Sequence, residues 1–176
     1  IRLIEAARSA GATRFVYISS GSVHEKILPG RPLDETHPTW STSHYGAHKA
    51  AVEAFVHSYG FGHKYPICAL RPTGIYGLAR PPKESKWYDL IRAVAAGQDV
   101  TCQTGGKEVH AADVARAVEI LLTAEPAAIA GQSFECCDRY VSELEVAPIA
   151  RDASGSPAQA LGTAPTPKNQ IVTDKL

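Results

Sequence analysis

The sequence predicts an α/β fold in which a parallel sheet carries helices on both faces, the doubly wound arrangement. Short apolar runs rich in β-branched and aromatic residues, typical of buried strands, alternate with longer segments of helical periodicity. Segments rich in glycine, proline and hydroxyl residues follow the first two apolar runs. Because ligands bind at the carboxyl ends of strands in such sheets, these segments are where a functional site is expected.

The first part of the chain alternates helix, strand and loop. Apolar residues recur at helical spacing over residues 1–10, and Gly11 follows as a helix stop. Residues 14–19 read RFVYIS and predict a buried strand. A long proline-containing loop is expected over residues 21–43, and loops of this length are commonly functional. Residues 43–59 then predict a helix that ends at the following glycines.

The middle of the chain repeats this order. Residues 66–70 (PICAL) predict the next strand, and residues 71–82 predict a Gly/Pro-rich connection. An amphipathic helix is expected over residues 84–96 and a short strand over residues 99–103. Gly105 and Gly106 are interpreted as a turn.

The last part predicts fewer elements. Residues 111–124 form a strongly apolar helical pattern, and residues 133–137 could be a strand. A helix is expected over residues 142–153, with a kink or an early break at Pro148. Beyond Ser154 the chain is rich in proline, alanine and threonine and shows little periodicity.

Composition excludes several classes of protein. The 176 residues carry 18 basic and 18 acidic side chains, so no net charge attracts nucleic acid or an anionic membrane. No run approaches the roughly 18–20 apolar residues of a membrane span, and no signal peptide is recognisable, which predicts a soluble cytoplasmic protein. The four cysteines lack CxxC spacing and are expected to be reduced core thiols: Cys68, Cys102, Cys136 and Cys137. The first helix lacks both a cap and an initiator Met, which predicts an N-terminally truncated fragment.

A tyrosine and a lysine open the helix that follows the long loop. Tyr45 and Lys49 are four residues apart, so their side chains share one helical face. A neighbouring ammonium favours the ionised form of a phenol, which makes the phenol a better proton acceptor at neutral pH. Ser19, Ser20 and Ser22 follow the first strand, where a hydroxyl could hold a substrate oxygen. Such a pair also occurs by chance in helices without catalytic function.

Four motifs occur in a fixed order: VYISSGSV, STSHYGAHKAAVE, LRPTGIYG and VHAADVARAV. Together they resemble the extended short-chain dehydrogenase/reductase family of the NAD-dependent epimerase/dehydratase type, over residues 1 to about 154. The resemblance implies a Rossmann-like domain whose C-terminal half, with the catalytic residues, spans residues 1–78. Residues 79–176 would be mainly the smaller substrate-binding region, interleaved with the last Rossmann elements. It also implies NAD or NADP as cofactor, a small-molecule substrate, and a homodimer packed through the helices at 1–11 and 44–60.

The resemblance assigns roles to individual residues. Tyr45 matches the catalytic tyrosine, Lys49 the lysine that stabilises its phenolate and bonds the nicotinamide ribose, and Ser20 the serine that orients the substrate. Arg71 lies at the end of the second strand, where a structural role is as plausible as a contact with the cofactor. His110 and Asp113 match the point where a loop enters a helix in the family. The expected cofactor contacts are Ser19, Tyr45, Lys49, Pro72, Thr73, Gly74 and Ile75. The expected substrate contacts are Ser20, Ser22, His24 and Arg80.

Departures from the family pattern limit what the resemblance implies. His24 and Glu25 stand where the family commonly has Tyr-Gly, so the wall beside the substrate is altered, which argues against a sugar-nucleotide substrate but not against the redox chemistry. The Gly-rich phosphate-binding turn GxxGxxG is missing from these residues. The sequence predicts an NAD(P)-dependent epimerase, dehydratase or reductase that acts on a hydroxyl- or carbonyl-bearing carbon. A catalytically silent NAD(P)-sensing or scaffold protein on the same fold is the alternative.

Overall fold

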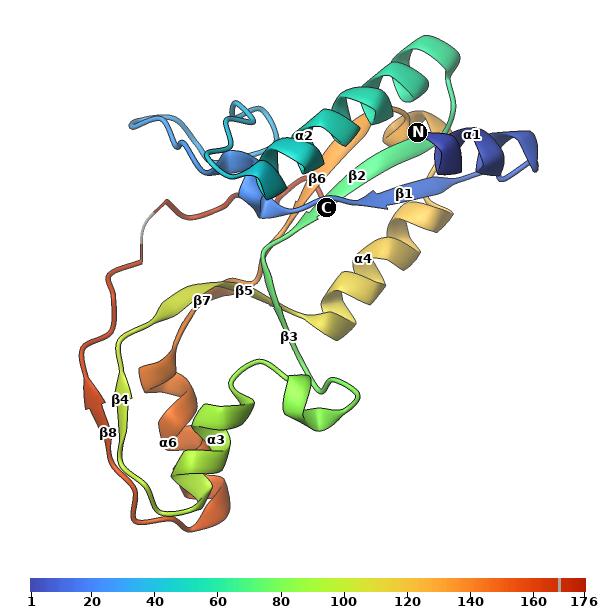
Figure 1. Cartoon of the computed structure of the whole chain (residues 1–176). Helices are drawn as coiled ribbons and strands as arrows, with labels where there is room; N and C mark the ends of the chain where they lie inside the picture. Colours follow the sequence, from blue (N-terminus) through green and yellow to red (C-terminus); the bar gives the residue numbers. More distant parts are fainter. Residues whose placement is uncertain (168) are drawn as a thin grey trace. The chain divides into compact units, whose positions relative to one another are not determined.

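The computed structural model describes residues 1–167 and 169–176, and contacts group the chain into two units (Figure 1). The first unit comprises Ile1–Thr73, Ala112–Cys137 and Asn169–Leu176. The second comprises Gly74–Ala111 and Asp138–Lys168. The chain therefore passes between the units after positions 73, 111, 137 and 168. The division of roles after residue 78 stays a prediction.

A three-stranded parallel sheet forms the centre of the first unit, in the order β1-β2-β6. Its strands are β1 (Phe15–Ile18), β2 (Ile67–Pro72) and β6 (Gln132–Cys136). Every residue of β2 is buried, because this strand has a neighbour on each edge and a helix layer on each face. The prediction of a parallel α/β sheet is confirmed.

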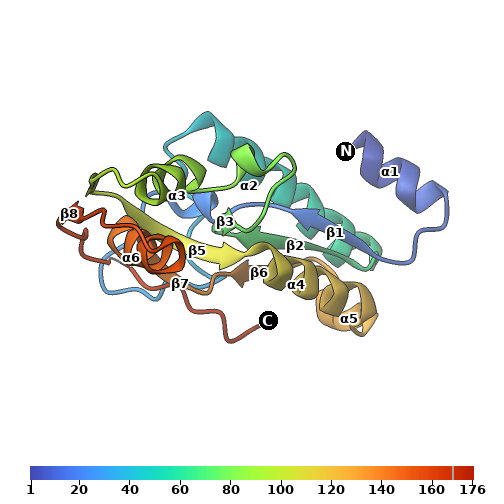
Figure 2. The same ribbon diagram turned by 90° about the horizontal axis from the view of Figure 1, so that it is seen from below.

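Helices cover both faces of this sheet (Figures 1 and 2). On one face, α1 (Arg2–Ser9) and α2 (His44–His57) pack through Ile4 and Val56 against Ile67 and Ala69 of β2. On the other face, α4 (Ala111–Thr123) and α5 (Pro126–Ile129) place Leu121 and Ile129 beside Phe134 of β6. Because side chains alternate along a strand, one apolar set of residues faces each helix layer.

Helix α2 begins and ends where its sequence dictates. Ser43 has an extended backbone, and its hydroxyl accepts a hydrogen bond from the N–H of Gly46 at 3.1 Å, which caps the helix. The helix passes at residue 58 into a single π-helical turn, Ser58–Gly62. The expected stop at this point is thus a widened turn that contains both glycines. Before α2, the long loop starts with a short 3-10 turn, Gly21–His24.

The second unit contains a mixed sheet and a small helical layer. Its sheet has the order β3-β5-β7, with β3 parallel and β7 antiparallel to β5. A separate parallel pair is formed by β4 and β8. Val94 and Cys102 pack with Ala147 and Ala150 in its core. The elements are β3 (Gly74–Tyr76), η3 (Pro82–Glu84), α3 (Tyr88–Ala95), β4 (Val100–Cys102), β5 (Gly105–His110), β7 (Arg139–Ser142), α6 (Glu143–Ser154) and β8 (Ala160–Gly162).

Three expectations for this unit are wrong. The connection at 71–82 contains β3, and the turn expected at Gly105–Gly106 is the start of β5, since ladder bonds to β7 override the weak strand propensity of glycine. The helix expected from residue 84 begins only at Tyr88, because Trp87 has a left-handed backbone with φ of 62°.

Pro148 does not end α6, which continues to Ser154. The carboxylate of Glu145 accepts hydrogen bonds from the N–H and hydroxyl of Ser142, at 3.0 and 3.2 Å, and so closes the first turn. Burial of Ala147 and Ala150 holds the next turn against the core, which offsets the hydrogen bond that proline cannot donate.

Cys68, Cys102 and Cys136 are buried, as expected of core thiols, whereas Cys137 is half-buried. Burial raises the pKa of the Cys68 thiol to about 12, so this thiol stays protonated. Among residues 1–167 and 169–176, every helix is too short or too polar to traverse a lipid bilayer.

The widened turn after α2 generates a stability prediction. A Cβ added to Gly60 would lie 1.9 Å from the backbone nitrogen of Gly131, whereas a Cβ on Gly62 would meet no atom within 4 Å. We expect Gly60→Ala to lower the free energy of unfolding by at least about 2 kcal/mol, because the backbone at Gly131 must move to make room for the methyl group. Gly62→Ala, the matched control, should change it by less than about 0.5 kcal/mol. Chemical denaturation measures both, and equal effects would contradict this packing.

Candidate functional site

Tyr45 and Lys49 lie on the first two turns of α2, at the end of β1. Lys49 Nζ donates a hydrogen bond to the carbonyl oxygen of Ile18, the last residue of β1, at 2.8 Å. The ammonium is also 5.6 Å from the ring centroid of Tyr45 and 5.2 Å from that of Tyr17. Tyr45 is 56% exposed, so its phenol is accessible to a ligand. The structure therefore brings a cation beside an accessible phenol.

Ser20 opens the 3-10 turn that packs against the start of α2. Its hydroxyl accepts a hydrogen bond from the N–H of Ser22 at 3.2 Å, which orders the turn. A Cβ on Gly46, next to Tyr45, would lie 2.3 Å from the carbonyl oxygen of Ser22. Glycine at this position thus allows the turn and the helix to touch. The contact places the predicted substrate-orienting serine and the predicted catalytic tyrosine on two elements that pack directly together.

A buried carboxylate on α2 bonds to two strands of the first sheet and to the residue that follows the third. Glu53, one turn beyond Lys49, is 1% exposed. On β2, Arg71 donates from Nε to Oε1 and from Nη2 to Oε2 of Glu53, at 3.0 and 2.6 Å. On β6, the hydroxyl of Ser133 donates to Oε2 at 3.3 Å. Just past β1, the buried hydroxyl of Ser19 donates to Oε1.

The other side of Arg71 contacts a second carboxylate. Nη1 of Arg71 donates to Oε1 of Glu135 on β6 at 2.9 Å, and this glutamate is fully buried. His24 Nε2 lies 2.9 Å from the same oxygen and 3.0 Å from Arg71 Nη1, and Nδ1 lies 3.1 Å from the carbonyl oxygen of Pro38. Both ring nitrogens of His24 therefore face protein groups, and its proposed contact with substrate stays a prediction.

The pKa shifts follow from this pairing. Burial favours the neutral form of Glu53, but the hydrogen bonds and positive charge of Arg71 outweigh burial and lower the pKa of the carboxyl. Burial likewise acts against the charge of Arg71, but hydrogen bonds and charge from Glu53 and Glu135 raise its pKa further. Both groups thus stay ionised at neutral pH. A buried pair of this kind is stable only while each partner keeps the other.

From the sequence alone, neither Glu53 nor Glu135 has an expected role. Glu53 lies four residues after Lys49 and eight after Tyr45, so helical spacing alone places it on the same stripe of the helix as that pair. Glu135 is a charged residue within an otherwise uncharged strand run, which is an indication of a buried partner. Their partner Arg71 holds the structural position that was one of its two expected roles.

The remaining predicted contacts lie along the end of β2 and in the second unit. Pro72 ends β2 and is buried; the backbone N–H of Thr73 donates to the carbonyl oxygen of Cys136 at 3.1 Å. Gly74 and Ile75 belong to β3 of the second unit. Arg80 is exposed. The structure tests none of their expected roles, which stay predictions.

In the second unit, His110 ends β5 and packs edge-on against Tyr76, with ring centroids 5.1 Å apart. Tyr76 also packs against Trp87 at 5.4 Å, and Lys86 forms an ion pair with the buried carboxylate of Glu108. Asp113 lies in the first turn of α4, as expected of an early-helix carboxylate.

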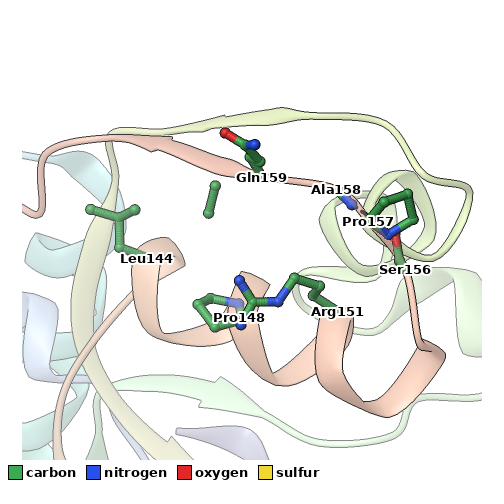
Figure 3. Close-up of a pocket in the computed structure, with 8 residues that line it drawn as sticks. Leu144, Pro148, Arg151, Ser156, Pro157, Ala158 and Gln159 are labelled. Atoms are coloured by element: carbon green, nitrogen blue, oxygen red, sulfur yellow. Dashed lines mark hydrogen bonds between the residues drawn. The ribbon is translucent and has the colours of Figure 1, made fainter.

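A surface groove of about 520 Å³ also lies in the second unit, between α6 and the segment that leads to β8 (Figure 3). Its lining residues are Leu144, Pro148, Arg151, Ser156, Pro157, Ala158, Gln159 and Ala160. They include none of the residues that the sequence assigns to catalysis, cofactor or substrate. In the described part of the chain, no group of three or more His, Cys, Asp or Glu side chains could hold a metal ion.

Comparison with known proteins matches most of the chain to one family. Residues 1–137 match the model of the NAD dependent epimerase/dehydratase family. Over 92 residues the chain is 34% identical to dTDP-D-glucose 4,6-dehydratase of Mus musculus, a match that covers 51% of this chain and 26% of the mouse protein.

Two solved structures show the same fold. The dTDP-glucose 4,6-dehydratase of Bacillus anthracis in complex with NAD superposes with a TM-score of 0.74 at 16% identity, over 98% of this chain and 57% of that one. RMD of Pseudomonas aeruginosa, complexed with NADPH, gives a TM-score of 0.75 at 18% identity, over 98% and 61%. This chain thus spans little more than half of each solved protein. The likeness shows that the fold is Rossmann-like.

The start of α2 generates a prediction about acid stability. The carboxylate of Glu25 accepts hydrogen bonds from the hydroxyls of Ser43 and Thr42, at 2.6 and 2.8 Å, and from the backbone N–H of Ser43 at 2.7 Å. Together these bonds lower the pKa of Glu25 from 4.5 to about 2, and the bond from the Ser43 hydroxyl has the largest effect. A depressed folded-state pKa stabilises the fold above pH 4.5, and this stabilisation is lost as pH falls toward about 2.

We therefore expect Glu25→Gln to be less stable than the parent above pH 4.5, with a difference that shrinks as pH falls toward about 2. Denaturant unfolding of both proteins across this pH range measures the difference. A difference that stays constant with pH would contradict the assigned role of the carboxylate.

Proposed function

Because this chain belongs to the NAD dependent epimerase/dehydratase family, we propose that it carries the catalytic residues of an NAD- or NADP-dependent enzyme that acts on a sugar nucleotide. The observation that carries the proposal is the accessible Tyr45 phenol beside the Lys49 ammonium, next to the turn that Ser20 opens. The dTDP-D-glucose named for the mouse relative supports the substrate class. The proposal covers epimerases and dehydratases, which return the hydride within one cycle, and reductases, which do not.

Each of the three side chains has one task. Tyr45 exchanges a proton with the substrate hydroxyl or carbonyl oxygen, and Lys49 stabilises the phenolate that remains. Ser20 donates a hydrogen bond to the same substrate oxygen and so fixes its position. A bound nicotinamide supplies or accepts the hydride at the adjoining carbon. Proton transfer by a positioned side chain contributes typically ~100- to 10,000-fold to rate.

The residues at this edge of the sheet are suited to hold a nicotinamide nucleotide. The hydroxyl of Thr73 is buried and has no hydrogen-bond partner among the described residues. Lys49 donates a hydrogen bond to Ile18, and its ammonium has further donors that a ribose could accept from. Lys49, Tyr45 and the segment Pro72, Thr73, Gly74 and Ile75 would line the cofactor. The hydroxyl of Ser19 already donates to Glu53, so Ser19 would contact the cofactor through its backbone.

We also propose a homodimer packed through α1 and α2. Both helices present apolar side chains to solvent: Leu3 is 72% exposed on α1 and Phe55 is 41% exposed on α2. Exposed apolar residues on neighbouring helices are typical of a surface that another chain covers. The cytoplasmic location stays a prediction of the sequence.

Replacement of Tyr45 by Phe tests the proposed chemistry. In the full-length protein we expect turnover of dTDP-glucose or UDP-glucose to fall at least ~100-fold, because the proton has no acceptor. Binding of NADH and NADPH, followed by nicotinamide fluorescence, should stay within about threefold of the parent, since Lys49 and the β2 segment remain. Tyr59→Phe is the control, because Tyr59 bonds Glu5 on α1, away from Tyr45.

Unchanged turnover in Tyr45→Phe would contradict the proposal that Tyr45 is catalytic. A parent protein that binds NADH or NADPH but turns over neither sugar nucleotide would instead favour the NAD(P)-sensing or scaffold alternative. The titration also identifies which of the two nucleotides the protein prefers.

A further inference from the structure

Few hydrogen bonds hold the Lys49 ammonium beside Tyr45. Its ammonium has one protein acceptor at hydrogen-bond distance among the described residues, the carbonyl oxygen of Ile18 at 2.8 Å. Its other close contacts are the rings of Tyr17 and Tyr45, at 5.2 and 5.6 Å. A cation within about 6 Å of a ring centroid is attracted by the negative face of that ring. The two rings therefore contribute to the position of the ammonium.

The two rings differ in how firmly they are held. Tyr17 belongs to β1, where it pairs with Ala69 of β2, and it packs on the buried cluster that includes Val56 of α2. Tyr45 lies on the first turn of α2, and more than half of its surface is exposed. Tyr17 is thus the fixed side of the arrangement, and Tyr45 is the side that a ligand can reach.

The phenol of Tyr17 also stays protonated at neutral pH. Burial raises the pKa of Tyr17 above its ordinary value of 10, and the charges of Glu53 and Tyr45 raise it further. A neutral phenol attracts Lys49 through its ring and does not compete with Tyr45 as a second phenolate. The accessible phenol beside the Lys49 ammonium is therefore that of Tyr45.

We propose that Tyr17 is a positioning residue, whose ring holds the ammonium of Lys49 beside Tyr45 and so helps this phenol to ionise. The proposal rests on the proposed function, because it concerns the same tyrosine and lysine. It adds a third residue, on β1, to the tyrosine and lysine that one sequence motif contains. Tyr17 itself touches neither substrate nor cofactor in this proposal.

The test follows the ionisation of Tyr45 directly and needs no substrate. Ultraviolet absorbance of tyrosinate is recorded against pH for the full-length protein and for the same protein with Tyr45→Phe; the difference between the two curves belongs to Tyr45. The same pair of curves is recorded in the backgrounds Tyr17→Phe and Tyr17→Leu. Tyr17→Phe keeps the ring, whereas Tyr17→Leu removes it.

We expect the Tyr45 curve to stay in place with Tyr17→Phe. With Tyr17→Leu it should move to higher pH, by about two- to fivefold in proton concentration, as loss of a ~0.5–1 kcal/mol cation–π contact predicts. A structural defect alone would not separate the two backgrounds in this way. Near-ultraviolet circular dichroism establishes that each variant is folded, and Tyr17→Met replaces the leucine variant if that one unfolds.

A Lys49→Met variant separates the proposed role of Tyr17 from the proposed function of Tyr45 and Lys49. If Lys49→Met moves the Tyr45 curve and Tyr17→Leu leaves it unchanged, the role of Tyr17 is wrong and the proposed function stands. If Lys49→Met leaves the curve unchanged, Lys49 does not assist Tyr45, and the proposed chemistry and the role of Tyr17 both fail. Equal shifts with Tyr17→Phe and Tyr17→Leu would also overturn the proposal, because the ring would then not be the cause.

Discussion

The arrangement of the site depends on one buried ion pair, Glu53 with Arg71. Its carboxylate accepts hydrogen bonds from the region after β1 and from β2 and β6, and Arg71 extends the same network to Glu135 and His24. A charge that loses its partner inside a protein costs ~3–5 kcal/mol, so each member of the pair fixes the position of the other. The carboxyl ends of β1 and β2 and residues 133–135 of β6 are thereby held to one helix.

This constraint has a functional consequence because the same helix carries Tyr45 and Lys49. Glu53 fixes α2 against the sheet one turn beyond Lys49, and Lys49 is itself bonded to the end of β1 through Ile18. The turn opened by Ser20 then packs on Gly46, which has no side chain to keep it away. The proposed catalytic side chains thus lie on a rigid frame, although Tyr45 remains accessible to solvent. A site on regular elements keeps its geometry better than one formed by loops alone.

The sequence predicted the parts of this frame that depend on local patterns. Apolar runs of β-branched residues placed β1 and β2, and helical spacing with Ser43 as a cap placed α2. The start of β5 was missed because Gly105 and Gly106 become a strand only through pairing with β7. Glu53 and Glu135 were missed for a related reason: a carboxylate is expected at the surface until a buried partner such as Arg71, distant in sequence, is known.

Hydrogen exchange of the full-length protein with Glu53→Gln tests this dependence most directly. The account predicts that amide protection falls together near Ser19, at the end of β2 and in β6, while the exposed-surface control Glu119→Gln keeps the parent pattern. Protection that is unchanged in Glu53→Gln, or that falls in α2 alone, would contradict the claim that one carboxylate holds the three strands of this sheet to the helix.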